Sequence, residues 1–404
     1  MKILLLTQYY LPEIGAPQNR LSELAIRLKQ MGDEIVVLTA LPNYPHQEIY
    51  EGYRGKRKVK EIIEGIEVHR TWLFVRKSSS IFLRLLNYFS FVWSSFWYGW
   101  FKLGKFDLII CESPPLFLGI TAWLLKKLKG SKLLFNVSDL WPESAEKLGL
   151  VTNRTFLKLA GSLERFMYKH SELISGQTQG IVKSISVRFP KKKIFWLRNG
   201  VNTNFFDPLK EYEDIRIRLG IGKDKFVIFY GGIIGHAQGL EVILKAASFI
   251  KETNVLFVLA GEGPVKEELM KMKETLNLSN VLFIPAFKKQ EMPAVIKSID
   301  ASVIPLKKLD LFLGAIPSKI FESLNMKKPI ILGVDGEARE LFINTGNCGL
   351  YFEPENEKDL AEKIMLLFND KQLYSNLAEN AYDYVFKNFN RDIIAKEFKE
   401  FITN

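Results

Sequence analysis

The 404-residue sequence contains few of the residues that build metal sites and disulfide frameworks. It has four histidines and only two cysteines, Cys111 and Cys348, which lie far apart with no metal-ligand spacing around them. This scarcity argues against a zinc site and against a disulfide-stapled scaffold. We expect both thiols to be buried and reduced, as in a reducing compartment.

Long apolar runs are also missing. No window reaches the roughly 18–20 uninterrupted apolar residues of a membrane-spanning helix. The first eight residues contain one basic residue and only four consecutive apolar positions, fewer than the roughly 7–15 of a secretion signal. We interpret this start as a first buried strand.

Negative charge is scarce in one half of the chain. The formal net charge is +11, and residues 1–200 carry a net charge of +14 whereas residues 201–404 carry −3. This asymmetry predicts an anionic partner for the first half alone: nucleic acid, anionic lipid or a phosphorylated substrate.

Short β-branched and aromatic runs alternate with segments of helical period, the pattern of an α/β fold with parallel sheets. In the second half we expect strands at Phe226–Tyr230, Val255–Ala260, Val281–Ile284, Ala301–Pro305, Ile330–Val334 and Leu350–Phe352. The first half opens with a strand at Ile3–Leu6, a helix at Gln18–Met31 and a strand at Ile35–Thr39. Each half therefore begins strand, glycine-containing loop, helix, strand, which predicts two Rossmann-like domains in tandem.

A turn-rich link at Asn199–Asn202 separates the two halves. We expect a first domain at residues 1–200 and a second at residues 201–382. The segment Leu373–Ile402 is predicted to form two helices, and we expect residues 383–404 to fold back and pack against the first domain.

The glycine-rich segment Gly231–Gly239 directly follows an expected strand and opens a helix. Glycines let backbone amides approach an anion closely, so the segment is a candidate cradle for a diphosphate. A glycine-rich turn without a ligand is the simpler alternative. A nicotinamide-dinucleotide site is disfavoured because G-x-G-x-x-G is not matched.

The segment Ile316–Glu322 follows the strand that ends near Pro305. Ser318 is a suitable N-cap, and Lys319 and Glu322 lie three residues apart on one helical face. The cation would hold phosphate oxygens and the carboxylate would accept both ribose hydroxyls. A surface salt bridge on a capped helix remains the alternative.

Taken together, several segments resemble the GT4-type retaining glycosyltransferases with the GT-B fold. They are Tyr230–Gly232 with the following glycines, Leu259–Pro264, Pro317–Lys319 with Glu322, Asn199–Val201 and Gly349–Leu350. Asp139–Ser144, with Ser113–Leu116 upstream, resembles the bacterial surface-polysaccharide branch related to the N-acetyl-L-fucosamine transferases. The resemblance covers nearly the whole chain in order, and it implies two Rossmann-like domains that face a central cleft.

The resemblance also implies functional residues. Those implied to bind the donor are Gly15, Gly232, His236, Gln238, Gly261, Ser318, Lys319 and Glu322. Asp139 and Lys319 would be catalytic, and Asp139 and His46 would contact the acceptor. A tight turn at Gly15 and a helix N-cap at Asp139 are equally compatible with the sequence.

Three positions depart from the family pattern. Ile233 and Gln238 stand where the family has Arg and Lys on the glycine-rich loop, and Gly314 replaces the first Glu of the family's E-x7-E pair. The diphosphate would therefore depend more on Lys319, His236 and backbone amides, because these remain available to bind it. No Asp-x-Asp lies at a loop where a metal would bridge the diphosphate, so we expect metal-independent transfer with no cofactor beyond the nucleotide-sugar substrate, a UDP sugar.

The stretch from Ile81 to Phe101 is dense in aromatic residues and flanked by basic ones. Such a stretch suits the headgroup region of a membrane. The residues we assign to this surface are Arg84, Trp93, Trp97 and Trp100. A helix packed on the sheet with a solvated basic face is the alternative. Nucleic-acid binding is disfavoured, because the aromatics form one apolar block instead of being spaced along a basic groove.

The sequence thus predicts a glycosyltransferase of the hexosyltransferase type, peripheral on the cytoplasmic face of the cell membrane. It would move a sugar, of the N-acetylamino-deoxy class, from a nucleotide to a lipid-diphosphate-linked saccharide in O-antigen or capsule synthesis. The alternatives are an enzyme similar to the UDP-N-acetylglucosamine 2-epimerases, which share the two-domain architecture, and a non-catalytic membrane or nucleic-acid adaptor.

Overall fold

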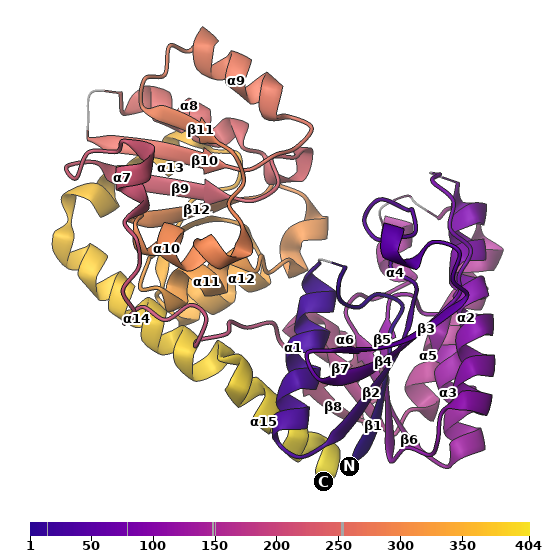
Figure 1. Ribbon diagram of the computed structural model, residues 1–404. Helices are drawn as coiled ribbons and strands as arrows, with labels where there is room; N and C mark the ends of the chain where they lie inside the picture. The colour runs from indigo at the N-terminus through magenta and orange to yellow at the C-terminus, as the bar shows by residue number, and fades with distance from the viewer. Residues whose placement is uncertain (14, 79, 148, 150, 252–253) are drawn as a thin grey trace. The chain divides into compact units, whose positions relative to one another are not determined.

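The computed structural model describes residues 1–13, 15–78, 80–147, 149, 151–251 and 254–404. The chain divides into two compact units, each with its own sheet (Figure 1). Unit 1 comprises Met1–Asn199 together with Ile394–Asn404, and unit 2 comprises Gly200–Ile393. The chain passes between them within the predicted turn-rich link.

Unit 1 is built on a sheet of eight described strands in the order β3-β4-β2-β1-β5-β6-β7-β8. The strands are β1 (Lys2–Leu6), β2 (Glu34–Ala40), β3 (Lys58–Ile63), β4 (Ile66–Thr71), β5 (Leu108–Ser113), β6 (Lys132–Val137), β7 (Leu173–Gly176) and β8 (Lys193–Trp196). All neighbours pair in parallel except β3 and β4, which form an antiparallel hairpin at the edge. The carboxyl ends of the parallel strands therefore share one edge of the sheet.

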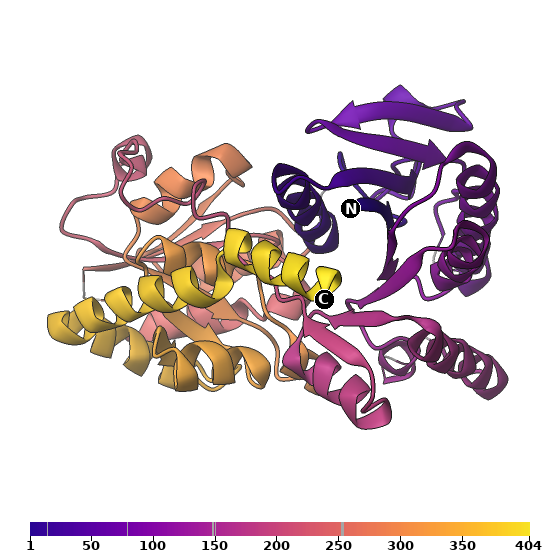
Figure 2. The same ribbon diagram turned by 90° about the horizontal axis from the view of Figure 1, so that it is seen from below.

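Helices cover both faces of this sheet (Figure 2). They are α1 (Ala16–Gln30), α2 (Ile81–Lys102), α3 (Leu118–Lys129), α4 (Glu143–Lys147), α5 (Arg154–His170), α6 (Gln179–Arg188) and, from the end of the chain, α15 (Arg391–Thr403). The α1 face also holds Ile394, Phe398 and Ile402 of α15, whereas α2 and α3 pack on the opposite face. The last helix thus contributes apolar side chains to the core of unit 1.

Unit 2 has a parallel sheet of six described strands in the order β11-β10-β9-β12-β13-β14. The strands are β9 (Phe226–Gly231), β10 (Val255–Ala260), β11 (Val281–Ile284), β12 (Ala301–Pro305), β13 (Ile330–Gly333) and β14 (Gly349–Tyr351). The helices are α7 (Ile215–Leu219), α8 (Glu241–Phe249), α9 (Lys266–Thr275), α10 (Met292–Lys297), α11 (Lys319–Asn325), α12 (Glu337–Arg339), α13 (Glu357–Asn369) and α14 (Lys371–Phe389). This is the doubly wound pattern that the sequence predicts.

Every strand predicted in the second half is present, with ends that shift by at most one residue. The two helices expected near the end of the chain are α14 and α15. Helix α14 belongs wholly to unit 2, and the part of the chain that groups with unit 1 begins at Ile394. The parallel order places the loops after β9, β10 and β12 at one edge of the unit 2 sheet, because β9 lies between the other two strands.

Candidate functional site

The glycine-rich loop of unit 2 leaves the carboxyl end of the central strand β9. Its backbone is held in place from both sides: the Gly232 amide donates to the Ala260 carbonyl (2.9 Å), and the Ile234 amide donates to the Glu262 carbonyl (2.9 Å). Gly232 has a φ of +144°, a conformation that residues with a Cβ rarely adopt. The loop therefore has a fixed shape before any ligand arrives.

The loop after β10 packs directly against this first loop. A Cβ added to Gly261, whose φ is +157°, would lie 1.9 Å from the Gly232 carbonyl oxygen. Two backbones can approach so closely only where no side chain intervenes. Gly261, which the resemblance assigns to the donor site, thus packs against the backbone of the glycine-rich loop.

Lys319 is the first residue of α11, and its side chain reaches back to the glycine-rich loop. Its Nζ lies 4.0 Å from the centroid of the Tyr230 ring, and a Cβ placed on Gly232 would be 3.0 Å from the same atom. The ammonium is attracted by the face of the ring. Within the described part of the chain no carboxylate forms an ion pair with it, so its charge is available to an anion beside Gly232.

Glu322 follows one helical turn later, and both side chains are half-buried. Burial lowers the pKa of Lys319 to about 8, against the opposing effect of Glu322. Burial also raises the pKa of Glu322 to about 7, although the positive charges of Arg391, Lys319 and Lys289 lower it. Both groups therefore titrate near neutral pH, as groups in binding sites often do.

Ser318 corrects one expectation from the sequence. Its side chain makes no capping hydrogen bond, because its backbone is already helical (φ −61°, ψ −28°). A capping residue needs an extended backbone for its oxygen to reach the amides of the first turn. The exposed Ser318 hydroxyl lies beside Lys319 without capping α11.

His236 and Gln238 lie in the short 3-10 helix His236–Gln238 that continues the glycine-rich loop. His236 is exposed, and Gln238 is half-buried with its Oε1 close to Gly235. At Gly314, where the family has a carboxylate, an added Cβ would meet nothing within 4 Å. The site therefore has open space at that position.

The candidate residues of unit 1 follow three strands that end at the same sheet edge. Gly15 is the residue before α1 and has an extended backbone. His46 is exposed on the loop after β2. Asp139 follows β6, is exposed, and accepts a hydrogen bond from the Ser144 hydroxyl (2.7 Å). Asp139 is not the residue before helix α4, so it does not cap that helix in the usual way.

Two buried carboxylates near this edge escape prediction from the sequence. Glu13 accepts hydrogen bonds from the backbone amides of Tyr10, Asn43 and Tyr44 at 2.8–3.0 Å, and burial raises its pKa. Glu13 and Asn43 are 30 residues apart, so this carboxylate joins the loop after β1 to the loop after β2.

The second buried carboxylate is Glu112, at the end of β5. Arg20 of α1 donates to it (3.1 Å) and to the Ser138 hydroxyl (2.5 Å), and the Asn136 side chain donates to it as well. Burial raises the pKa of Glu112, against the opposing effect of the Arg20 charge. Ser138 precedes Asp139, so this cluster fixes the backbone from which Asp139 projects.

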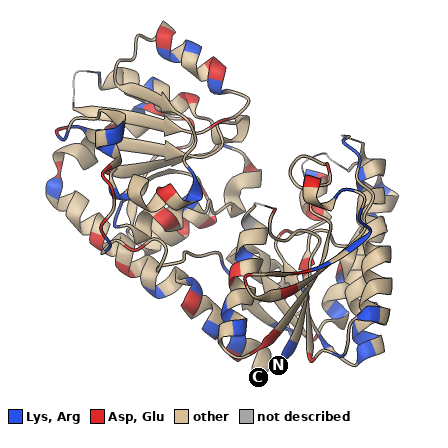
Figure 3. Cartoon of the chain, in the orientation of Figure 1, with Lys and Arg blue, Asp and Glu red and all other residues tan. Residues whose placement is uncertain are grey.

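Helix α2 carries the residues assigned to a membrane surface. Its inner face packs through Phe91, Ser95 and Gly99, as expected for a helix on a sheet. The outer face is apolar too, and its exposed side chains include Phe82, Leu86, Phe89, Trp93, Trp100 and Phe101. Trp97 is half-buried and stacks on Phe101 (5.6 Å between ring centroids). Figure 3 shows Lys and Arg near both ends of this helix, and Arg84 is exposed at the end of its first turn.

Among the described residues, no helix is long and apolar enough to cross a membrane. The same residues also contain no group of three or more His, Cys, Asp or Glu side chains that could hold a metal ion.

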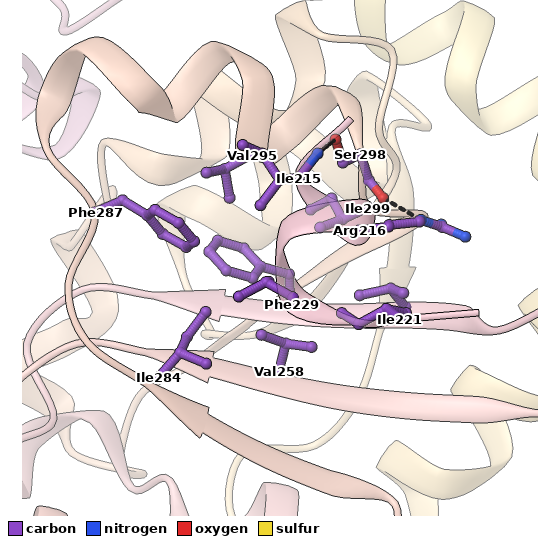
Figure 4. Close-up of a pocket in the computed structure, with 12 residues that line it drawn as sticks. Ile215, Arg216, Ile221, Phe229, Val258, Ile284, Phe287, Val295, Ser298 and Ile299 are labelled. Atoms are coloured by element: carbon purple, nitrogen blue, oxygen red, sulfur yellow. Dashed lines mark hydrogen bonds between the residues drawn. The ribbon is translucent and has the colours of Figure 1, made fainter. Parts of the chain in front are cut away.

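A small apolar cavity of about 20 Å³ lies within unit 2, between its sheet and the helices α7 and α10 (Figure 4). Phe229, Phe287 and Val295 line it, and the Arg216 side chain donates to the Ser298 carbonyl at its margin (2.5 Å). Its volume holds no more than a water molecule. It is a packing gap and no part of the donor site.

Both halves of the chain match models of glycosyltransferase families. Residues 211–384 match the family model "Glycosyl transferases group 1", and residues 15–200 match "Glycosyl transferase 4-like domain". The chain belongs to the group 1, GT4-type glycosyltransferases. It is therefore an enzyme that transfers glycosyl groups, and the epimerase and adaptor alternatives lose their support.

Among its relatives is the putative colanic acid biosynthesis glycosyl transferase WcaI of Escherichia coli, which is 28% identical over 97% of this chain and 100% of its own length. A second is the N,N'-diacetylbacillosaminyl-diphospho-undecaprenol alpha-1,3-N-acetylgalactosaminyltransferase of Campylobacter jejuni, 28% identical over 49% of this chain and 51% of its own.

Solved structures confirm the GT-B fold. HepE of Anabaena, in complex with UDP-glucose, matches 100% of this chain and 99% of its own with a TM-score of 0.70 and 18% identity. Sucrose-phosphate synthase of Thermosynechococcus elongatus matches 100% and 98% with a TM-score of 0.73 and 15% identity.

Proposed function

We propose that this glycosyltransferase moves a sugar from a UDP sugar to a lipid-diphosphate-linked saccharide during synthesis of a surface polysaccharide, O-antigen or capsule. Transfer proceeds with retention at the anomeric carbon and without a metal ion. The donor sugar belongs to the N-acetylamino-deoxy class, a choice that rests only on the resemblance of Asp139–Ser144 to the fucosamine transferases.

One observation carries the proposal: the Lys319 ammonium lies against Gly232 and the Tyr230 ring, with Glu322 one turn away. Cleavage of the bond between the sugar and the diphosphate develops negative charge on the leaving phosphate. A cation and amides already in position stabilise that charge without reorganising. Lys319, with the glycine-rich loop and His236, would bind the diphosphate, and the ionised Glu322 would accept the ribose hydroxyls.

Unit 1 would present the acceptor. Asp139 would accept a hydrogen bond from the attacking acceptor hydroxyl, since its carboxylate is exposed and the Ser144 hydroxyl donates to one of its two oxygens. The new bond joins the acceptor oxygen to the anomeric carbon, UDP leaves, and the acceptor proton goes to the leaving phosphate or to Asp139. The names of the E. coli and C. jejuni relatives, which refer to a polysaccharide and to a diphospho-undecaprenol acceptor, support the lipid-linked acceptor.

The outer face of α2 supports peripheral attachment at the cytoplasmic side of the membrane. Exposed aromatic side chains such as Trp93, 65% exposed, partition into the headgroup region, and each basic residue near an anionic surface adds about 1 kcal/mol. A helix that faced only water would carry polar side chains on this face.

The test measures the thermal stabilisation of the purified protein by UDP, GDP, dTDP and NAD at matched concentrations. A ligand that binds only the folded state raises the melting temperature by mass action. We expect a shift with UDP alone. Glu322→Ala should abolish most of that shift, and the control Glu267→Ala, an exposed residue of α9, should keep it. A shift with NAD alone, or an unchanged UDP shift in Glu322→Ala, would contradict the assignment.

UDP sugars that stabilise the protein are then supplied with a polyprenyl-diphosphate-linked saccharide, and the product linkage is read by NMR. An α-linked product from an α-linked donor demonstrates retention. Release of free sugar or an epimerised nucleotide sugar without acceptor would contradict transfer to the lipid-linked saccharide.

A further inference from the structure

Unit 1 contains a cavity of about 220 Å³ at the carboxyl edge of its sheet. Its wall is formed by Tyr9 after β1, Tyr44 after β2, Arg76 after β4 and, from the first two turns of α2, Arg84 and Tyr88. Apart from Gly15, which does not line this cavity, the donor residues described above belong to unit 2. The cavity is therefore a separate site within unit 1.

The lining of this cavity is positively charged. Arg76 and Arg84 are part of it, whereas no Asp or Glu is. In the parts of the chain that are described, neither guanidinium forms an ion pair or a side-chain hydrogen bond, so both keep their full set of donors for a ligand. A guanidinium presents its donors as a planar fork that suits phosphate oxygens, and two such groups contribute to this lining.

The wall is fixed before a ligand binds. The Asn87 side chain donates to the Phe74 carbonyl (2.7 Å) and accepts from Gln8 (2.7 Å), which ties α2 to the ends of β1 and β4. Gln47 accepts from the Ser78 amide (3.0 Å), and the buried Glu13 holds the amides of the loop that carries Tyr44. A preformed site loses little conformational entropy when it binds.

The apolar outer face of α2 begins in the same two helical turns as the cavity. Arg84, Asn87 and Tyr88 lie at helical spacing on the side of α2 that lines the cavity. Phe82, Leu86 and Phe89, spaced four and three residues apart, form a stripe on the other side of the helix and are 68%, 40% and 43% exposed. The cavity therefore lies at the level of α2 where the proposed membrane surface begins.

We propose that this cavity binds the phosphate or diphosphate headgroup of a polyprenyl-type lipid, with Arg76 and Arg84 on the phosphate oxygens. The inference rests on the proposed function, because that headgroup is the lipid-diphosphate part of the acceptor. It gives Arg84, which the sequence associated with the membrane alone, a role in binding the charged portion of the acceptor. His46 lies between cavity-lining neighbours but is not itself in the lining.

The experiment measures sedimentation of the protein with phosphatidylcholine vesicles that carry a few mole per cent of polyprenyl diphosphate. Vesicles of equal surface charge made with phosphatidylglycerol, a phosphodiester without a terminal phosphate, serve as the comparison. The variant is Arg76→Gln with Arg84→Gln. The control is Arg57→Gln with Lys58→Gln, which removes the same charge from exposed positions of unit 1 outside the cavity. Unchanged melting temperatures establish that both double variants are folded.

We expect the native protein to prefer the diphosphate vesicles, and the cavity variant to lose at least about tenfold in affinity for them while the control loses little. Equal losses in both variants would overturn the proposal in favour of general surface charge. No loss in the cavity variant would overturn it outright. If inorganic diphosphate bound the native protein as tightly as the lipid does, the lipid-headgroup assignment would be wrong.

Failure of this inference and failure of the proposed function are distinguishable, because the vesicle assay requires neither nucleotide nor transfer. If the protein transfers a sugar to a lipid-linked saccharide but the arginine variants bind vesicles normally, the enzyme assignment stands and the headgroup site in the cavity is wrong. If vesicle binding depends on the arginines but UDP does not stabilise the protein, the headgroup site stands and the UDP-sugar assignment is wrong.

Discussion

The affinity for a UDP sugar should depend on pH with a maximum between pH 7 and pH 8. The pKa of Glu322 is raised to about 7 and that of Lys319 is lowered to about 8 in the free protein. The nucleotide needs Glu322 ionised, to accept ribose hydroxyls, and Lys319 protonated, to bind phosphate. Acidification therefore protonates the carboxylate before the ligand arrives, and alkali removes the proton from the ammonium. Both changes weaken binding.

The expected size follows from these pKa values. With a pKa of about 7, roughly 9% of Glu322 is ionised at pH 6 and about 76% at pH 7.5. With a pKa of about 8, the protonated fraction of Lys319 falls by the same factor between pH 7.5 and pH 9, and it is about 99% at pH 6. Because both groups must be charged, the affinity should fall about sixfold from pH 7.5 to either pH 6 or pH 9, which corresponds to about 1.1 kcal/mol of binding free energy on each side.

Calorimetric titration with UDP-glucose between pH 5.5 and pH 9.5 measures this profile. UDP-glucose is preferable to UDP because its phosphates are diesters that do not titrate in this range. Glu322→Gln should flatten the acidic side, and Lys319→Arg should flatten the alkaline side, because arginine stays protonated. A flat profile for the native protein, or an acidic side that survives in Glu322→Gln, would refute the assigned roles.

Three further predictions concern the loops of the donor site, the membrane surface of α2 and the metal independence of transfer. Gly261→Ala should lower the melting temperature by several degrees, because a strained conformation costs about 1–3 kcal/mol and the added Cβ would lie 1.9 Å from a backbone oxygen. The control Gly314→Ala should melt like the native protein, because its added Cβ has nothing within 4 Å. Replacement of Trp93, Trp97 and Trp100 by Ser should release a folded protein from anionic liposomes in a flotation assay, and retained binding would show that the outer face of α2 is not the membrane contact. EDTA should leave the transfer rate unchanged, and a loss that Mn²⁺ or Mg²⁺ restores would contradict metal-independent transfer.

The fold could be predicted from the sequence because its signals are local. The apolar runs that became β9, β10 and β12 are short and bounded by turn residues, and the segments between them have helical period. The antiparallel edge strand β3 (Lys58–Ile63) was not predicted. Three of its six residues are charged, as is common where a sheet edge faces water, so it lacks the apolar signal of the central strands.

The donor site was partly predictable for a related reason. In a parallel sheet the carboxyl ends of neighbouring strands share one edge, so the segments after β9 and β12 must meet once both strands are known. The contact of Lys319 with Gly232 and Tyr230 follows from that topology. The conformation of Ser318 does not, because whether a serine caps a helix depends on a backbone torsion that the residue type only biases.

The buried polar clusters of unit 1 could not be predicted at all, since they join residues remote in sequence. Arg20 and Glu112 are 92 positions apart, and each looks like an ordinary charged residue of a helix and a strand. Burial of such a pair brings little net stability, because desolvation offsets the attraction between the charges. The cluster instead fixes geometry: Arg20 bonds both Glu112 and Ser138, so α1, β5 and the residue before Asp139 are held in one arrangement. Glu13 does the same for the loops that border the cavity. In unit 1 the residues proposed to meet the acceptor are therefore exposed, and the carboxylates that position them are buried beneath.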